Sequence, residues 1–243
     1  MTHKTKGIVL RSIKYGETSL VVTVFTELFG VQTYMVNGVR SSKKSSSKAN
    51  QLQPGAILDL MVYHSDQKSM QRIREFSWCV LYQQVLSNVI KNSIALYMVE
   101  LLYKCLKQPE QNTPLFYFCE DVLLALDEAN KAVTANIPLY FALQLPHFFG
   151  FKINDDYSEA QPILDLQEGC FVDEVPVHPN YVEGSNAALT SQLLKVLQPY
   201  ELEAFPMHHA VRRQLLLRYH EYFSLHVPDF GEVKTMAVMA EVL

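Results

Sequence analysis

The first 80 residues of the chain consist of short segments rich in β-branched and aromatic residues, and this pattern limits the fold more than any other feature. Five segments can be separated, at residues 4–15, 18–30, 31–40, 56–65 and 69–80. Gly30 separates the second from the third, and a polar turn separates the last two, as in hairpins. Five short strands with a long polar loop after the third are typical of a small oligonucleotide-binding (OB) barrel, whose closure removes exposed edges.

After residue 80 the apolar residues recur at steps of three and four, which places them on one face of a helix. A first helix is expected before Pro109, with a core face made of Ile90, Ile94, Tyr97, Leu101 and Cys105. Thr113 followed by Pro114 predicts the start of a second helix, because a capping residue precedes a proline whose missing N–H is not needed there.

Residues 132–151 contain no formal charge and are numerous enough to cross a membrane. Pro138, Pro146 and several polar side chains favour a buried helix interrupted by proline instead. Two further helices are expected at 185–198 and 207–226, the second with a core face of Val211, Leu215, Leu216 and Tyr219. The predicted fold class is therefore α+β with two domains.

The expected boundary lies near residue 80, with an OB-fold domain at 1–80 and an α-helical domain at 81–243. Inside the second domain, residues 154–184 are acidic and rich in turn residues, with no clear period. A loop of this length is uncommon in a compact domain. Three alternatives stay open for this segment: a functional loop, a reduced module, or short strands.

Charge divides the chain at the same boundary. Residues 1–80 hold 11 Lys and Arg against 5 Asp and Glu, a balance of +6, whereas residues 81–243 hold 10 against 20, a balance of −10. An acidic chain with one basic half is typical of a protein whose basic domain binds a polyanion. The alternative is chance clustering of charge on a solvated surface.

Part of the basic excess lies in the serine-rich loop 38–55, which has too little apolar surface to be packed in a core. Such a loop can neutralise phosphates without requiring a base sequence. The expected loop contacts are Arg40, Lys43, Lys44 and Lys48. Because strands of a small barrel lie close together, four strand residues are expected to continue the basic surface: Arg11, Lys14, Arg72 and Arg74.

Catalytic and metal sites find little support. His208 and His209 are adjacent, so on a helix they diverge by about 100°, and the chain contains no H-E-x-x-H, P-loop or G-x-S-x-G motif. Its four cysteines include no C-x-x-C pair, which favours free thiols in a reducing compartment. We therefore expect no enzyme, no catalytic residue, no cofactor and no metal. The N-terminus lacks the apolar core of a signal peptide.

Two stretches of the basic half, "GIVLRSIKYGETSLVVTVFTELFG" and "YMVNGVRSSKKSSSKANQLQPG", resemble the N-terminal region of the RecO family of bacterial recombination mediators. The matching positions are Gly7 to Leu10, Glu17, Thr26 with Gly30, Gly38 with Arg40, and Leu52 to Pro54. The resemblance continues through "ALYMVELLYKCL", "LQLPHFFGF" and "RRQLLLRYHEYFSLHVPDF", so it covers nearly the whole chain.

The resemblance implies an OB barrel with a helical domain that binds single- and double-stranded DNA and anneals complementary strands. It also implies work with RecR to load RecA onto strands coated by single-stranded-DNA-binding protein, whose C-terminal tail would bind the helical domain. The residues of that tail site are unknown, with Arg212, Arg213 and Arg218 as candidate neighbours. The implied location is the bacterial cytoplasm, at the nucleoid, and not a membrane.

The chain departs from the family at one point. Many members carry a four-cysteine zinc module after the Gly-Phe that corresponds to Gly150 and Phe151, whereas only Cys170 is present here before the next helix. We therefore expect 154–184 to be that module without zinc, held by packing alone.

Two other functions stay open. An RNA-binding barrel of translation or ribosome assembly would share the basic OB surface but prefer structured RNA. A nuclease would need clustered carboxylates with a divalent metal, a pattern that the sequence does not favour.

Overall fold

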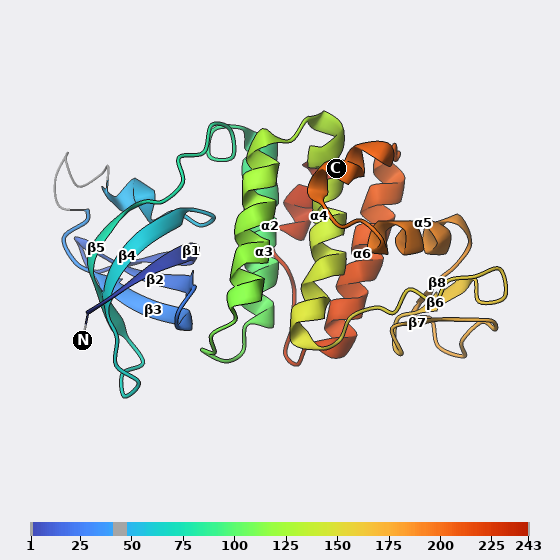
Figure 1. Ribbon diagram of the computed structural model, residues 1–243, viewed down its shortest axis with the longest axis horizontal. Coiled ribbons are helices and arrows are strands. Elements are labelled where there is room, and N and C mark those ends of the chain that lie inside the picture. The colour runs from blue at the N-terminus through green and yellow to red at the C-terminus, as the bar shows by residue number, and fades with distance from the viewer. Residues whose placement is uncertain (1, 41–47, 243) are drawn as a thin grey trace. The chain divides into compact units, whose positions relative to one another are not determined.

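The computed structural model of the protein describes residues 2–40 and 48–242 (Figure 1). The five expected strands are confirmed as β1 (Thr2–Tyr15), β2 (Ser19–Thr26), β3 (Gly30–Val36), β4 (Ile57–Tyr63) and β5 (Gln71–Trp78). They close into a barrel, as expected for an OB-type fold, and the strand order around it is β1-β2-β3-β5-β4. The basic loop lies between β3 and β4, where the sequence predicted it. However, Val39 and Leu52 are buried in the barrel core and residues 48–51 are helical, so the expectation that this segment packs in no core is wrong for its described ends.

Side chains alternate between the inside and the outside of the barrel because successive residues of a strand point to opposite faces. On β2, Val22 and Val24 are fully buried, while Thr23 between them is partly exposed. Tyr34 on β3 and Leu58 on β4 are also fully buried and belong to the same core. This closed apolar core fixes which residues of each strand reach solvent.

The pairing of the strands corrects one expectation. Residues of β1 and β5 were expected to be neighbours, but β1 pairs with β2 and β4, whereas β5 pairs with β4 and β3. The β3–β5 pair is parallel and joins Tyr34 to Gln71 and Met35 to Arg72. Chain order could not reveal this arrangement, because closure brings together strands that are distant in sequence.

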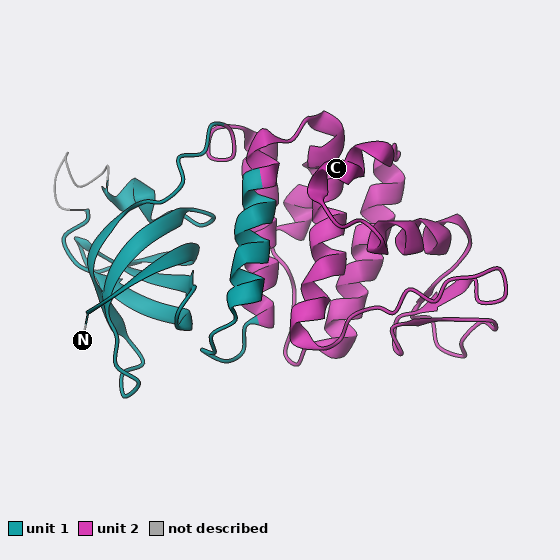
Figure 2. Cartoon of the chain, viewed as in Figure 1, with its two compact units in different colours: residues 1–83, 106–124 teal, residues 84–105, 125–243 magenta. Residues whose placement is uncertain are grey.

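The compact unit around the barrel comprises residues 1–83 and 106–124 (Figure 2). The Lys6 ammonium lies 2.9 Å from a carboxylate oxygen of Glu120, and the Tyr117 hydroxyl donates to Glu27 at 2.7 Å. Gly30 has a φ of +61°, and a Cβ there would lie 2.0 Å from the carbonyl oxygen of Glu110. The barrel unit thus includes part of the helical sequence, which a single boundary near residue 80 does not describe.

The remaining residues, 84–105 and 125–243, form the helical unit. Its helices, together with α3, which contributes residues to both units, are α2 (Val89–Cys105), α3 (Thr113–Glu128), α4 (Lys131–Gln144), η1 (Leu145–Phe149), α5 (Gly184–Leu194), η2 (Pro199–Ala204), α6 (His209–His226) and α7 (Met236–Val242). All the expected helices are present, and α7 was not anticipated.

Ile90 is 46% exposed, so its predicted place on the core face of α2 is wrong. The side chain that caps α3 is that of Asn112, which accepts from the Leu115 N–H at 3.0 Å, rather than that of Thr113.

The uncharged stretch at 132–151 forms α4 and η1, as the buried-helix interpretation expected. Pro138 lies inside α4, and Pro146 lies in the first turn of η1. Asn136 is buried in α4 and donates from Nδ2 to the carbonyl oxygens of Leu202 and Phe205. Among the described residues, no helix combines the length and apolar character that crossing a membrane requires.

Residues 154–184 contain a sheet of three short strands. Of the three alternatives for this segment, the one that expected short strands is confirmed. The strands are β6 (Ile163–Asp165), β7 (Cys170–Val172) and β8 (Tyr181–Val182), in the order β7-β6-β8. The Asp165 carboxylate accepts from two backbone N–H groups of the β6–β7 turn and lies 3.3 Å from His178 Nε2. Hydrogen bonds therefore hold this module as well as packing, which corrects the expectation of packing alone.

Candidate nucleic-acid interface

The outer surface of the barrel unit carries basic side chains that form no hydrogen bond or ion pair with other described residues. In the described part of the chain, six of the basic residues on the strands and connecting loops of the barrel itself make no side-chain hydrogen bond or ion pair: Lys4, Arg11, Lys14, Lys48, Lys68 and Arg72. All six are exposed. Solvated cations with no internal partner can bind an external anion without first breaking an existing contact. The closed barrel therefore displays charge that is available to a polyanion.

A first group of cations lies at the β1–β2 hairpin. The backbone N–H of Arg40 donates to the carbonyl oxygen of Thr18 at 3.0 Å, and its guanidinium donates to that of Gly16 at 3.3 Å. These two bonds hold the start of the basic loop against the turn between β1 and β2. Arg11 and Lys14 are exposed on the same hairpin. We call Arg11, Lys14 and Arg40 the hairpin group.

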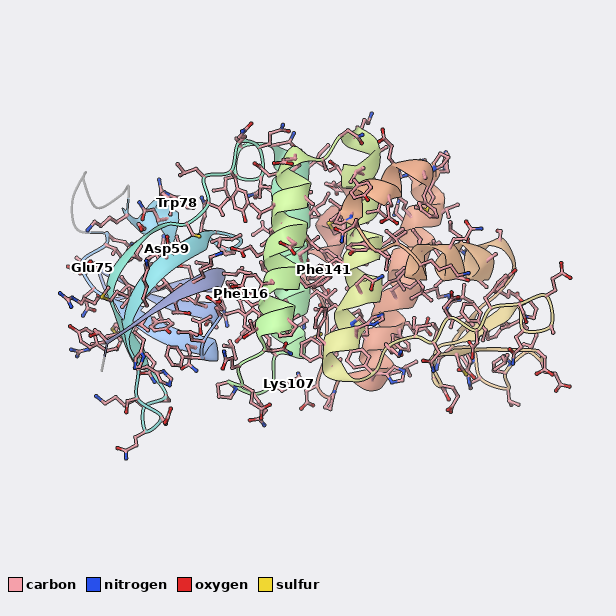
Figure 3. The ribbon with its side chains drawn as sticks, viewed as in Figure 1. Asp59, Glu75, Trp78, Lys107, Phe116 and Phe141 are labelled. Carbon is pink, nitrogen blue, oxygen red and sulfur yellow. The ribbon has the colours of Figure 1, made fainter. Side chains whose placement is uncertain are left out.

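A second group lies over β4 and β5, in a hollow of about 420 Å³ that we call the β4–β5 hollow. Its basic lining residues are Lys4, Lys48 and Arg74, and its acidic ones are Asp59 and Glu75, both labelled in Figure 3. The strand register shifts at this place, and a bulge leaves both Arg74 and Glu75 exposed. Their ion pair, 3.5 Å long and open to solvent, contributes little to stability.

A third group lies where the β4–β5 loop meets β3, in a hollow of about 750 Å³ that we call the loop hollow. Arg72 and Lys68 supply its positive charge, and Met35, Tyr63 and Met70 are its large apolar or aromatic lining residues. Arg72 pairs with Met35 on one side and with Tyr63 on the other, so these three outward side chains form one row across β3, β5 and β4. No carboxylate lines this hollow in the described part of the chain.

The expected DNA-binding residues are thus distributed over three places on the barrel. Arg11, Lys14 and Arg40 lie at the hairpin, Lys48 and Arg74 in the β4–β5 hollow, and Arg72 in the loop hollow. This arrangement differs from the continuous surface that was expected, because β1 and β5 are not neighbours. Lys43 and Lys44 lie outside the described residues, between Arg40 and Lys48 in the chain.

The structure adds Lys4, Lys68 and Tyr63 to the candidate residues. Alternation along β1 predicts that both Lys4 and Lys6 point outward, so the sequence could not distinguish them. Lys6 is committed to Glu120, and that hydrogen bond raises the pKa of Lys6 above its usual value. Lys4 pairs in register with Met61 and remains exposed. The two lysines therefore differ because Lys6 is paired with Glu120, which is distant in the sequence, whereas Lys4 remains available for binding.

The histidines of the helical unit have structural contacts. His208 precedes α6 and accepts at Nδ1 from the Ala210 N–H, and its ring lies 4.1 Å from that of His209. His220 is buried beside the hydroxyl of Tyr97 at 2.9 Å, and burial lowers its pKa to about 4. In the described residues, no group of three or more His, Cys, Asp or Glu side chains is placed to hold a metal ion.

Comparison with known proteins identifies the family. The profile described as "Recombination protein O N terminal" matches residues 1–82, and that described as "Recombination protein O C terminal" matches residues 86–232. The DNA repair protein RecO of Bacteroides fragilis is 32% identical over 244 residues, covering 100% of this chain and 99% of the relative. The DNA repair proteins RecO of Phocaeicola vulgatus and Flavobacterium johnsoniae are each 30% identical, with the same coverage. These matches confirm the resemblance seen in the sequence, and the chain belongs to the RecO family of DNA repair proteins.

Proposed function

We propose that this protein is a recombination mediator that works by binding DNA rather than by catalysing a reaction. It binds single- and double-stranded DNA, anneals complementary strands, and together with RecR helps to load RecA onto strands coated by single-stranded-DNA-binding protein. It needs no metal or cofactor for these steps and acts in the cytoplasm at the nucleoid. The observation that carries the proposal is the set of exposed, unpartnered cations on a closed barrel.

Annealing follows from this arrangement by electrostatics. Two DNA strands repel each other through their phosphates, and each basic side chain bound to a phosphate releases a counterion and weakens that repulsion. Cations distributed around a barrel can contact two DNA strands at once, since the hairpin group lies at β1 and its turn to β2, whereas both hollows lie over β4 and β5. Base pairing then supplies the free energy of the reaction, so no nucleotide needs to be hydrolysed.

Annealing of two complementary DNA strands, each coated with the cognate single-strand-binding protein, tests the proposal. The wild type is compared with a variant in which Arg40, Lys43, Lys44 and Lys48 are all changed to Ala. We expect rapid annealing by the wild type and at least a tenfold slower rate for the variant. Four lost phosphate contacts should also make the slope of log affinity against log salt less negative by about 3.

A variant with the same charge change outside the barrel provides the control. It replaces Lys107, Lys152, Lys195 and Lys234, all of them exposed, by Ala and should anneal like the wild type. Equal losses of annealing rate in the two variants would mean that the net charge of the protein, and not the basic loop, determines annealing. If the wild type anneals neither coated nor bare strands but binds structured RNA, the mediator proposal fails and the RNA-binding alternative takes its place.

The helical unit offers a site for the acidic tail of the single-strand-binding protein. A groove of about 590 Å³ lies between the start of α4 and the start of α6, with Lys131 and Arg212 as its formal charges and Phe205, Pro206 and Met207 as apolar lining. Arg212 lies in this groove, donating to the carbonyl oxygen of Met207, whereas Arg218 lines a different hollow and pairs with Glu221. A positive, apolar groove complements a tail with acidic residues and an apolar end.

Binding of the labelled tail peptide to the full-length protein tests this groove. Lys131→Glu should weaken binding at least fivefold, because it reverses the charge at an exposed position on the groove. Lys152→Glu, an equal change at an exposed residue that does not line the groove, should leave binding unchanged. Equal effects of the two variants would remove the groove from the proposal and leave the DNA-binding part standing.

A further inference from the structure

The loop hollow combines an exposed aromatic ring with positive charge and with an apolar surface. Tyr63 is 48% exposed and Met70 is 40% exposed, and both line the hollow with Met35. Arg72 stands between Tyr63 and Met35 in the register of the strands, and Lys68 lies on the loop above them. Its volume lies within the range of small-molecule sites in proteins. A site of this composition suits a ligand with one flat aromatic part and one anionic part.

The wall of the loop hollow is fixed by a buried glutamine. Gln71 is 3% exposed, and its side-chain amide donates to the carbonyl oxygens of Ser65 at 2.8 Å and Lys68 at 2.7 Å. Its side-chain oxygen accepts from the Ser65 N–H at 3.2 Å. These bonds tie the loop to the first residue of β5. The hollow is therefore formed before any ligand arrives, which lowers the entropic cost of binding.

The residue before the loop is held as firmly. The ring of His64 stacks on that of Phe29 at 4.0 Å, and its Nε2 lies 3.0 Å from the Asp66 carboxylate. His64 also lines the hollow. These contacts fix the end of β4 and the start of the β4–β5 loop. The part of the hollow next to the ring of Tyr63 therefore has a defined shape.

We infer that the loop hollow captures one unstacked base of single-stranded DNA, with the base on the ring of Tyr63 and the adjoining phosphates on Arg72 and Lys68. A single strand can turn a base out of its stack at little cost, whereas a base pair of duplex DNA must first be broken. The loop hollow therefore distinguishes single-stranded from double-stranded DNA, whereas the hairpin group and the basic loop bind the phosphate backbone of either form. This inference rests on the proposed function and assigns to one site the preference for unpaired DNA.

The experiment measures the affinity of Tyr63→Leu for a labelled single strand and for a duplex of the same length. Loss of one base–aromatic contact should weaken single-strand binding about tenfold. Duplex affinity should stay within twofold of the wild type. The slope of log affinity against log salt should not change, because no phosphate contact is removed. Tyr63→Phe keeps the ring and should restore single-strand affinity.

A matched control uses the other exposed tyrosine of the barrel surface. Tyr15 is 56% exposed at the end of β1 and does not line the loop hollow. Tyr15→Leu should leave single-strand affinity within twofold of the wild type. Arg72→Ala, in contrast, should make the salt slope for single strands less negative by about 0.7. This variant separates the phosphate contact from the base contact within one hollow.

Three outcomes would overturn the inference: equal weakening of single-strand and duplex binding by Tyr63→Leu, no weakening at all, or equal effects of Tyr63→Leu and Tyr15→Leu. An unchanged thermal unfolding midpoint of Tyr63→Leu shows that the barrel is intact, and Tyr63→Thr, which removes the ring but suits an exposed strand position, serves as the test if the leucine variant does not fold. Failure of the proposed function is distinguishable, because the wild-type protein would then bind neither single strands nor duplex DNA.

Discussion

The barrel and the helical unit differ in how many of their basic side chains are held by other protein groups. On the barrel, the unpartnered cations of the hairpin group and the two hollows face solvent, whereas in the helical unit five basic side chains are held by protein oxygen atoms: Lys91, Lys104, Lys195, Arg212 and Arg218. A charge next to apolar groups must be paired to be tolerated. Carboxylates pair with two of these five side chains, Lys195 and Arg218, and backbone carbonyl oxygens accept from the other three. Some basic residues of the helical unit therefore stabilise its fold, whereas the unpartnered ones on the barrel remain available for binding.

Lys91 shows the structural role in its strongest form. It is 4% exposed, and its ammonium donates to the carbonyl oxygen of Asp127 at 2.8 Å. The Asp127 carboxylate accepts from the backbone N–H groups of Gln84 and Val85, each at 2.8 Å. Burial lowers the pKa of Lys91. The network ties the residues before α2 to the end of α3 through one buried cation.

Removing Lys91 should give the largest loss of stability. Lys91→Ala leaves the Asp127 carbonyl and its nearby carboxylate without a cation, which should cost about 4 kcal/mol in the free energy of unfolding. Denaturant unfolding followed by circular dichroism measures this change. Lys152→Ala, at an exposed site in the same unit, should stay within about 0.5 kcal/mol of the wild type. Similar effects of both variants would contradict the contrast between held and available cations.

Acid should destabilise the helical unit through His220. The pKa of His220 is lowered to about 4 by burial, so between pH 6.5 and 4 the unfolded chain binds a proton that the folded chain does not. Stability is therefore lost as pH falls through this window, by about 3 kcal/mol at its lower end. Unfolding measured between pH 8 and pH 4 should show this slope, and His220→Gln should be less stable at pH 8 but less dependent on pH.

A nearby carboxylate acts in a lower pH window. Burial alone would raise the pKa of Glu100, but hydrogen bonds from Thr235 and Lys234 outweigh this effect and lower it. Stability from a depressed carboxylate pKa is present above the unfolded value of 4.5 and is lost as pH falls through the folded pKa. A loss that began only below pH 4.5 would therefore assign the acid sensitivity to Glu100 and contradict the assignment to His220.

In the barrel unit, Lys6 is paired with a largely buried carboxylate, and removing it should have an intermediate effect on stability. Lys6→Ala leaves Glu120, whose side chain is 7% exposed, without its partner and should cost about 2 kcal/mol of unfolding free energy. The double variant Lys6→Ala, Glu120→Ala should be more stable than the sum of the single effects predicts. Additive effects in this cycle would show that the ion pair does not contribute to stability.

Local patterns in the sequence were enough to predict the five strands, the basic loop and the main helices, because alternation and helical spacing depend only on neighbouring residues. They could not predict that β5 pairs with β3 instead of β1, since closure depends on contacts between distant strands. They also could not separate Lys4 from Lys6, because the carboxylate that engages Lys6 lies 114 residues away. The bulge that exposes both Arg74 and Glu75 likewise has no sequence signal here.

The smallest effect on stability should come from the hairpin group. Arg11→Ala combined with Lys14→Ala removes two exposed side chains that make no hydrogen bond or ion pair with the described residues, so the free energy of unfolding should change by less than about 0.5 kcal/mol. DNA affinity should respond instead, with a salt slope less negative by about 1.5 for single strands. Fluorescence anisotropy at several salt concentrations measures the slope, with Lys107→Ala combined with Lys152→Ala as the control of equal charge. A stability loss like that of Lys91→Ala, with an unchanged salt slope, would assign these two residues to the fold and remove the hairpin group from the interface. A changed salt slope with unchanged stability for the Arg11 and Lys14 variant, together with the stability loss of Lys91→Ala, would show that the hairpin group serves DNA binding and Lys91 serves the fold.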